Sequence, residues 1–188
     1  MGIFFIALAV VALFFFLIYN GLVSKRVACE NAWSQIDVQL KRRHDLIPNL
    51  VETVKGYAKH EQDTLQKVTA ARGAAVSASQ AGNVHQQIAA ENQLTGALRQ
   101  LLAVSESYPE LKANTNFASL QEEIASTENR IGFARQHYND SVGVYNIAIE
   151  QVPGNIVAGF GRFVKREFFE IDAAEKAAVS QAPKVSFS

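Results

Sequence analysis

The chain has 188 residues, enough for one domain with an appendage, and its 18 basic side chains balance its 18 acidic ones. This balance excludes the strongly basic composition that draws many proteins to nucleic acid, so we expect no nucleic-acid partner. The single cysteine, Cys29, excludes an internal disulfide and a thiolate cluster for zinc, and it fits a reducing compartment.

The N-terminal part of the chain has the composition of a membrane anchor. Residues 1–24 carry no charged side chain, and residues 3–19 (IFFIALAVVALFFFLIY, the apolar run) are almost wholly apolar. As a helix with a rise of about 1.5 Å per residue, the apolar run covers roughly 25 Å, and residues 20–23 extend it toward the thickness of a bilayer. We therefore predict a single transmembrane anchor over residues 1–24, with membrane lipid as a partner.

Three other uses of such a segment fit less well. A cleaved signal peptide has basic residues before its apolar stretch, whereas Lys25 and Arg26 follow it here. A lipoprotein signal requires an apolar residue at the place where Arg26 precedes Cys29. Myristoylation of Gly2 requires Ser or Thr where the chain has Ile6. An uncleaved anchor is the interpretation that we keep.

The charges beside the anchor predict its orientation. Lys25 and Arg26 follow the apolar run at once, and no base precedes it. The positive-inside bias then places the N-terminus outside and the body in the cytoplasm of a single-pass protein of the bacterial cytoplasmic (inner) membrane. A body on the periplasmic side is the alternative.

Three helical segments are predicted after the anchor. In residues 25–72 apolar side chains recur every three or four positions, with Arg43 as a polar interruption and a four-residue slip after Tyr57 that resembles a coiled-coil stutter. Residues 83–107 and 115–152 keep the same helical spacing. The predicted fold class is all-α: a single N-terminal transmembrane helix continuing into a long antiparallel three-helix, coiled-coil-like bundle, with a short Phe-rich C-terminal helix and an extended tail.

Capping and turn residues predict where these helices end. Asn83 followed by Gln86 resembles a capping box, Thr115 or Asn116 is expected to cap the last long helix, and Pro153 is expected to stop it. The predicted organisation is an anchor at 1–24, a membrane-proximal helical stalk at 25–45, a helical bundle at 46–152, and a C-terminal amphipathic segment with a tail at 153–188.

The stalk carries an apolar stripe that needs a partner. The predicted second helix has about 24 residues, too few at roughly 1.5 Å each to bring the chain back to residue 25. We therefore predict that the stripe contacts the same stripe of a neighbouring subunit in a homo-oligomer, through Val27, Trp33, Ile36 and Leu40. The alternative is that the C-terminal segment folds back over it.

The C-terminal segment mixes phenylalanines with bases. As a helix it would be apolar on one side and basic on the other, and we add Phe160, Phe163, Phe168 and Phe169 to the predicted partner interface. A membrane-surface helix and a short helix that caps the bundle are both open. The ending APKVSF, residues 182–187, is expected to form a short extended piece.

The stretch LKRRHDLIPNLVETVKGY, residues 40–57, is interpreted as a helix joint at Asp45 and Pro48. Either Asp45 caps a new helix with Pro48 in its first turn, or Pro48 kinks one continuous helix. Arg42 and Arg43 lie at this boundary, and we predict that they pair with acidic faces of a neighbour or of the arm at residues 122–128.

The sequence offers little for catalysis. The motif HEQDT at residues 60–64 begins like a zinc motif, but Thr64 replaces the second histidine. No phosphate loop or dinucleotide fingerprint occurs in the chain. We predict no enzyme activity, no catalytic residues, no metal and no cofactor.

A resemblance then covers nearly the whole chain. The stretch YNGLVSKRVACENAWSQIDVQLKRRHDLIPNLVETVKGYAKHE, followed by YPELKAN, NFASLQEEI, TENRI, FFE and APKVSF, resembles the LemA family of bacterial membrane proteins. The resemblance implies an N-terminal transmembrane helix, a long antiparallel helical body and no established enzymatic activity. A relative of the family belongs to the magnetosome membrane-building set.

Two functions are carried forward. The first is a non-enzymatic, membrane-anchored helical scaffold that self-associates and organises membranes or membrane-protein complexes. The second is a signalling or adaptor module that binds a heterologous protein partner at the membrane.

Overall fold

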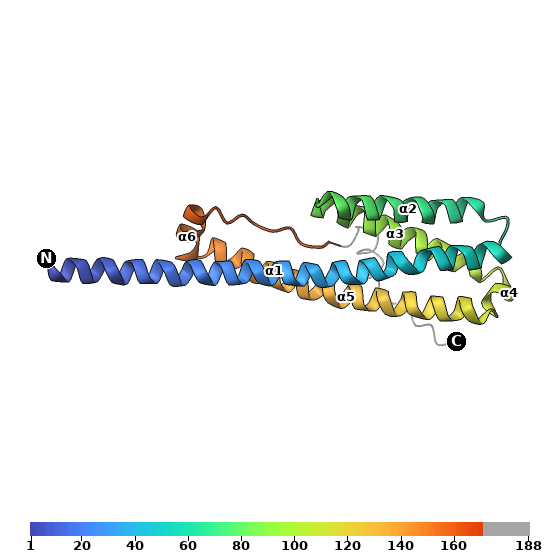
Figure 1. The fold of residues 1–188 in the computed structure, drawn as a ribbon, viewed down its shortest axis with the longest axis horizontal. Coiled ribbons are helices and arrows are strands. Elements are labelled where there is room, and N and C mark those ends of the chain that lie inside the picture. Colours follow the sequence, from blue (N-terminus) through green and yellow to red (C-terminus); the bar gives the residue numbers. More distant parts are fainter. Residues whose placement is uncertain (171–188) are drawn as a thin grey trace, which may run out of the picture. The chain divides into compact units, whose positions relative to one another are not determined.

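The computed structural model describes residues 1–170, and every regular element in that range is a helix. This confirms the predicted all-α class. The predicted APKVSF piece lies outside the described residues. Figure 1 shows the six helices, α1 (Gly2–Tyr57), α2 (Gln62–Ala81), α3 (Val84–Ser105), α4 (Pro109–Lys112), α5 (Thr115–Glu150) and α6 (Gly154–Gly161).

The chain forms two compact units. Unit 1 comprises residues 1–42 and 127–168, and unit 2 comprises residues 43–126 and the segment from Phe169. The helices α1 and α5 each contribute to both units. The domain boundaries drawn from the sequence stay a prediction.

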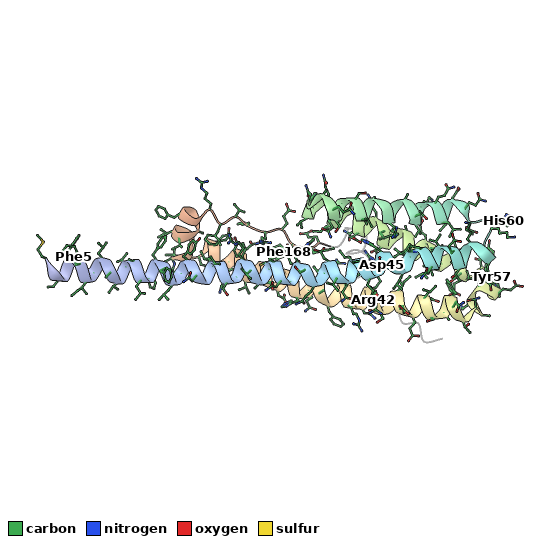
Figure 2. The ribbon with its side chains drawn as sticks, in the orientation of Figure 1. Phe5, Arg42, Asp45, Tyr57, His60 and Phe168 are labelled. Carbon is green, nitrogen blue, oxygen red and sulfur yellow. The ribbon has the colours of Figure 1, made fainter. Side chains whose placement is uncertain are left out.

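Unit 1 is built on the pairing of α1 with α5. The Trp33 ring packs edge-on against Tyr138, with ring centroids 5.1 Å apart. Ile36 on α1 and Val142 on α5 are fully buried in this unit. The N-terminal part of α1 is long and apolar enough to be a candidate membrane span, and its side chains, such as Phe5, project outward (Figure 2).

Residues 162–168, the return segment, follow α6 without regular secondary structure and lie on α5. Tyr145 Oη donates to the Val164 carbonyl at 2.9 Å, and Tyr138 Oη donates to the Glu167 carbonyl at 3.0 Å. Burial raises the pKa of both phenols, so both hydroxyls stay protonated donors at neutral pH. Asn146 of α5 also holds the segment, because its side chain bonds both the backbone amide and the carbonyl of Arg166.

Unit 2 packs parts of α1, α2, α3, α4 and α5 around one apolar core. The helices α2 and α3 run antiparallel side by side (Figure 1), joined at Gly82, whose φ of 69° suits glycine. The core includes Leu50 from α1, Val68 from α2 and Leu101 from α3, all fully buried. The Asn83 side chain accepts from the Gln86 amide at 3.1 Å, which confirms the predicted cap of α3.

Two predicted helix limits are wrong. The segment predicted as one helix over 25–72 breaks at residues 58–61, because α1 ends at Tyr57 and α2 begins at Gln62. The four-residue slip of the apolar pattern therefore marks a turn, which brings α2 back onto the core. Figure 2 shows Tyr57 and His60 at this end of unit 2. At the start of α5, Asn114 is the cap, since its Oδ1 accepts from the Phe117 amide at 3.0 Å.

The Asn146 side chain should limit local opening of the return segment, because it bonds the backbone there as a neighbouring strand would. Asn146 Nδ2 donates to the Arg166 carbonyl at 2.9 Å, and the Arg166 amide donates to Asn146 Oδ1 at 3.0 Å. We expect Asn146→Ala to speed hydrogen exchange in residues 162–168 by about 5- to 30-fold, because each lost bond contributes about 1 kcal/mol. Mass spectrometry of the peptides checks this. Exposed Asn155→Ala is the control, and equal exchange in both variants would contradict the role of Asn146.

Candidate functional site

A cluster of polar side chains lies inside unit 2, and we call Arg43, His44, Glu91 and Thr95 the buried ion cluster. The Arg43 guanidinium pairs with Glu91 Oε2 and donates through Nη1 to Thr95 Oγ1 at 2.9 Å. His44 Nε2 lies 2.9 Å from Glu91 Oε1. Exposure is 1% for Arg43, 7% for His44 and 2% for Glu91, so the carboxylate meets protein partners in place of water.

Helical spacing places both charges of the pair in the core. Arg43 falls between Leu40 and Ile47 on the apolar stripe of α1, and Glu91 falls three residues after Ile88 on the stripe of α3. Each helix therefore carries one charge on a face that is otherwise apolar. Packing these faces together brings the opposite charges into contact, which removes the cost of burying either alone.

Pro48 creates a contact between this part of α1 and α2. Pro48 lies inside α1 and has no N–H, so the His44 carbonyl, four residues earlier, lacks its helical donor. Arg72 of α2 supplies the missing donor, since its Nε bonds the His44 carbonyl at 2.7 Å. The same turn of α1 thus joins α2 through a backbone oxygen and α3 through two side chains.

The surroundings of Glu91 favour its ionised form. Burial by itself raises the pKa of the carboxyl, but the hydrogen bond with His44 and the charge of Arg43 outweigh it and lower the pKa below the usual 4.5. The ionised carboxylate therefore stabilises the fold above pH 4.5, and this contribution is lost as pH falls through the folded-state pKa.

The buried ion cluster is suited to packing rather than to chemistry on a ligand. Arg43 and His44 both pair with Glu91, and the low exposure of all three side chains keeps them away from solvent. Within residues 1–170, no three His, Cys, Asp or Glu side chains are grouped so that they could hold a metal ion.

The structure corrects the argument for the stalk stripe. Ile36 and Leu40 are 0% and 2% exposed, and Trp33 packs on Tyr138 within the same chain. The premise that this stripe lacks an intrachain partner is wrong, because α5 has 36 residues and is long enough to return along α1. Val27 is half-exposed, and its role in an interface stays a prediction.

The C-terminal phenylalanines divide into two pairs. Phe163 and Phe169 are buried, whereas Phe160 and Phe168 are exposed. The predicted amphipathic helix is shorter than expected: it ends at Gly161 because Arg162 adopts a left-handed conformation with φ 53°. The alternative that this segment folds back on the stalk is supported in unit 1, where Arg166 Nη2 donates to Glu30 Oε1 at 2.7 Å.

The predicted joint is a continuous helix. Because α1 runs through Asp45 and Pro48 without ending, the version in which Asp45 caps a new helix is wrong. The predicted pairing of Arg43 with a neighbour or with residues 122–128 is also corrected, since its partner is Glu91 of α3. Arg42 is exposed, and its place in an interface stays a prediction.

An exposed groove in unit 1 escaped the sequence analysis. It has a volume of about 490 Å³ and lies between α1 and α5, lined by Gln35, Val38, Gln39, Arg130, Phe133, Ala134 and His137. Phe133 is 73% exposed and Val38 is 64% exposed. The sequence signal for this groove was weak: Val38 and Phe133 are apolar residues on the otherwise polar side of their helices. The stronger apolar stripe on the opposite side drew the prediction away from them.

The sequence analysis also missed Glu91 as the partner of Arg43, although the sequence contained a signal for this pair. The interruption at Arg43 was visible, and a second interruption of opposite charge on the stripe of α3 could have been paired with it. Arg72 gave no comparable signal, because an arginine on an exposed helix face is ordinary.

Neutralising Glu91 should destabilise unit 2. Glu91→Gln keeps the size of the side chain but removes the carboxylate that pairs with buried Arg43, so we expect the free energy of unfolding to fall by about 3–5 kcal/mol at pH 7. The difference from the natural chain should narrow as pH falls from 4.5 through the lower folded-state pKa of Glu91, where this carboxylate becomes protonated. Denaturant titrations followed by circular dichroism at several pH values test this. Exposed Glu122→Gln is the control, and an equal effect of both variants would contradict the assignment.

The chain is similar to known proteins over most of its length. The sequence model of the LemA family matches residues 32–187. The chain is 25% identical over 175 residues to magnetosome protein MamQ 2 of Paramagnetospirillum magneticum, covering 81% of this chain and 64% of that protein. It is 27% identical over 143 residues to protein LemA of Metamycoplasma hominis, covering 74% of this chain and 63% of that protein. The chain thus spans somewhat less than two thirds of these relatives. The family match covers most of the chain, and the protein belongs to the LemA family.

Proposed function

We propose that this protein is a non-enzymatic, membrane-anchored helical scaffold that self-associates and organises membranes or membrane-protein complexes. The observation that carries the proposal is the groove of unit 1, where Val38 and Phe133 expose apolar side chains beyond the candidate span. The similarity to a magnetosome protein agrees with a role in assembling a larger structure.

Further exposed apolar side chains lie on the same faces of both helices, among polar ones such as Ser34 and Asp140. On α5, Val144 and Ile147 follow Phe133 at spacings of 11 and 14 residues, which return to the same helix face, and they are 55% and 53% exposed. On α1, Val27 precedes Val38 by 11 residues and shares its face. We define the docking face as these five residues. We propose that a second copy of the chain binds this docking face, in place of the stalk stripe that is buried against α5.

Because the chains are anchored in a membrane, a docking face of this size is sufficient for self-association. Chains held in one membrane meet with parallel axes and at raised effective concentration, so weak contacts produce assembly that they would not produce in free solution. The polar side chains of Arg130 and His137 border the apolar centre, as is common at interfaces between subunits.

A charge placed in the docking face should separate the subunits. We expect Phe133→Glu to weaken self-association of the detergent-extracted protein by about tenfold or more, because a carboxylate would lose water at the contact. Analytical ultracentrifugation in mild detergent measures this. Gln121→Glu adds the same charge at an exposed position of the same helix, away from the docking face, and should leave the mass unchanged. A natural chain that sediments as a monomer would contradict self-association and favour the adaptor function.

The proposal also places the body in the cytoplasm of a bacterium, with α1 crossing the inner membrane. Lys25 and Arg26 directly follow the candidate span, and such bases are retained on the cytoplasmic side. A green fluorescent protein fused after Ser188 should then fluoresce, and alkaline phosphatase fused there should be inactive. Active phosphatase would overturn this orientation and place the body in the periplasm.

A further inference from the structure

The short helix α6 packs against the apolar part of α1. Figure 1 shows α6 beside the N-terminal part of α1. In unit 1 the Phe160 ring meets Phe15 edge-on, with centroids 6.1 Å apart, and Phe163 meets Tyr19 at 5.5 Å. Phe15 precedes Lys25 by ten residues, so the contact lies about 15 Å along α1 from the first base. The helix α6 therefore sits beside the last turns of the candidate span.

The outer surface of α6 is largely apolar, with the exposed Asn155 at its start. The helix contains no charged residue, and it turns Val157 and Ala158 inward. Ile156 and Phe160 point outward, with exposures of 56% and 78%. Val152 and Val164, on either side of the helix, are also largely exposed. Because Phe160 touches Phe15, this surface continues directly into the exposed apolar side chains of the span.

Basic side chains border this surface on the side of the body. The Arg26 guanidinium lies 5.3 Å from the centroid of the Phe163 ring, and Arg162 is exposed directly after α6. An aromatic layer that includes Tyr19 and ends in arginines matches the order of a bilayer interface, where rings lie at the headgroup level and bases meet lipid phosphates.

We infer that α6 is a second membrane contact, a helix that lies in the interface of the same bilayer that α1 crosses. Ile156 and Phe160 reach the acyl chains of phospholipids, while Arg26 and Arg162 lie at their phosphates. Lipid is the occupant because the apolar face of α6 is continuous with a segment that itself needs lipid. The inference rests on the proposal that α1 spans the membrane, and the experiment below separates the two.

A tryptophan reporter tests the contact in the full chain. Trp33 is the only tryptophan, so Trp33→Phe gives a silent background into which Phe160→Trp is placed. The protein is reconstituted in vesicles of equal parts phosphatidylcholine and phosphatidylglycerol, with and without bromine on the acyl chains. We expect brominated lipid to quench about half of the Phe160→Trp fluorescence or more. Exchange of one exposed aromatic ring for another preserves the fold, which circular dichroism verifies.

Two matched reporters make each outcome decisive. Phe5→Trp reports the span, and Phe133→Trp reports an exposed ring on the body. Quenching at positions 5 and 160 with none at 133 supports the inference. Quenching at position 5 with position 160 as unaffected as 133 overturns it and leaves the anchor standing, which is also the result if a second copy covers α6. No quenching at position 5 overturns the anchor, and with it the membrane contact of α6.

Discussion

Unit 2 depends on a carboxylate that almost no water reaches. Glu91 lies on a helix face that is otherwise apolar, and it is tolerated there only because Arg43 and His44 meet it from α1. A shift of either helix by one turn would leave a buried charge without a partner. We therefore interpret the buried ion cluster as a device that selects one pairing of α1 with α3, more than as a source of net stability.

The proline of α1 belongs to the same device. A proline in the middle of a helix removes one backbone donor, and here the carbonyl that loses its donor belongs to His44, a member of the cluster. The bond from Arg72 turns this defect into an attachment point for α2. Contacts at one turn of α1 thereby hold α1, α2 and α3 together. No single residue type in the sequence predicts this arrangement.

The helical periodicity predicts much of this fold, and its failures have physical causes. The cap at Asn83 depends only on neighbouring residues, so the sequence reveals it. The turn after Tyr57 was concealed because a slip in an apolar pattern is compatible with either a continuous supercoil or a break. The partner of the stalk stripe was missed because the pairing of Trp33 with Tyr138 joins residues far apart in the chain, and spacing along one helix carries no information about such pairs. The candidate groove was missed for the same reason.

The pairing of α1 with α5 has a consequence for how the protein is made. Tyr138 leaves the ribosome about 100 residues after Trp33, which at about 5–20 residues per second is a delay of roughly 5 to 20 s. During this interval the apolar stripe of α1, including Ile36, has no covering helix. Biosynthesis therefore passes through a stage in which this part of α1 exposes apolar side chains to its surroundings. Until α5 is made, the stripe is open to apolar contacts that the finished fold no longer allows.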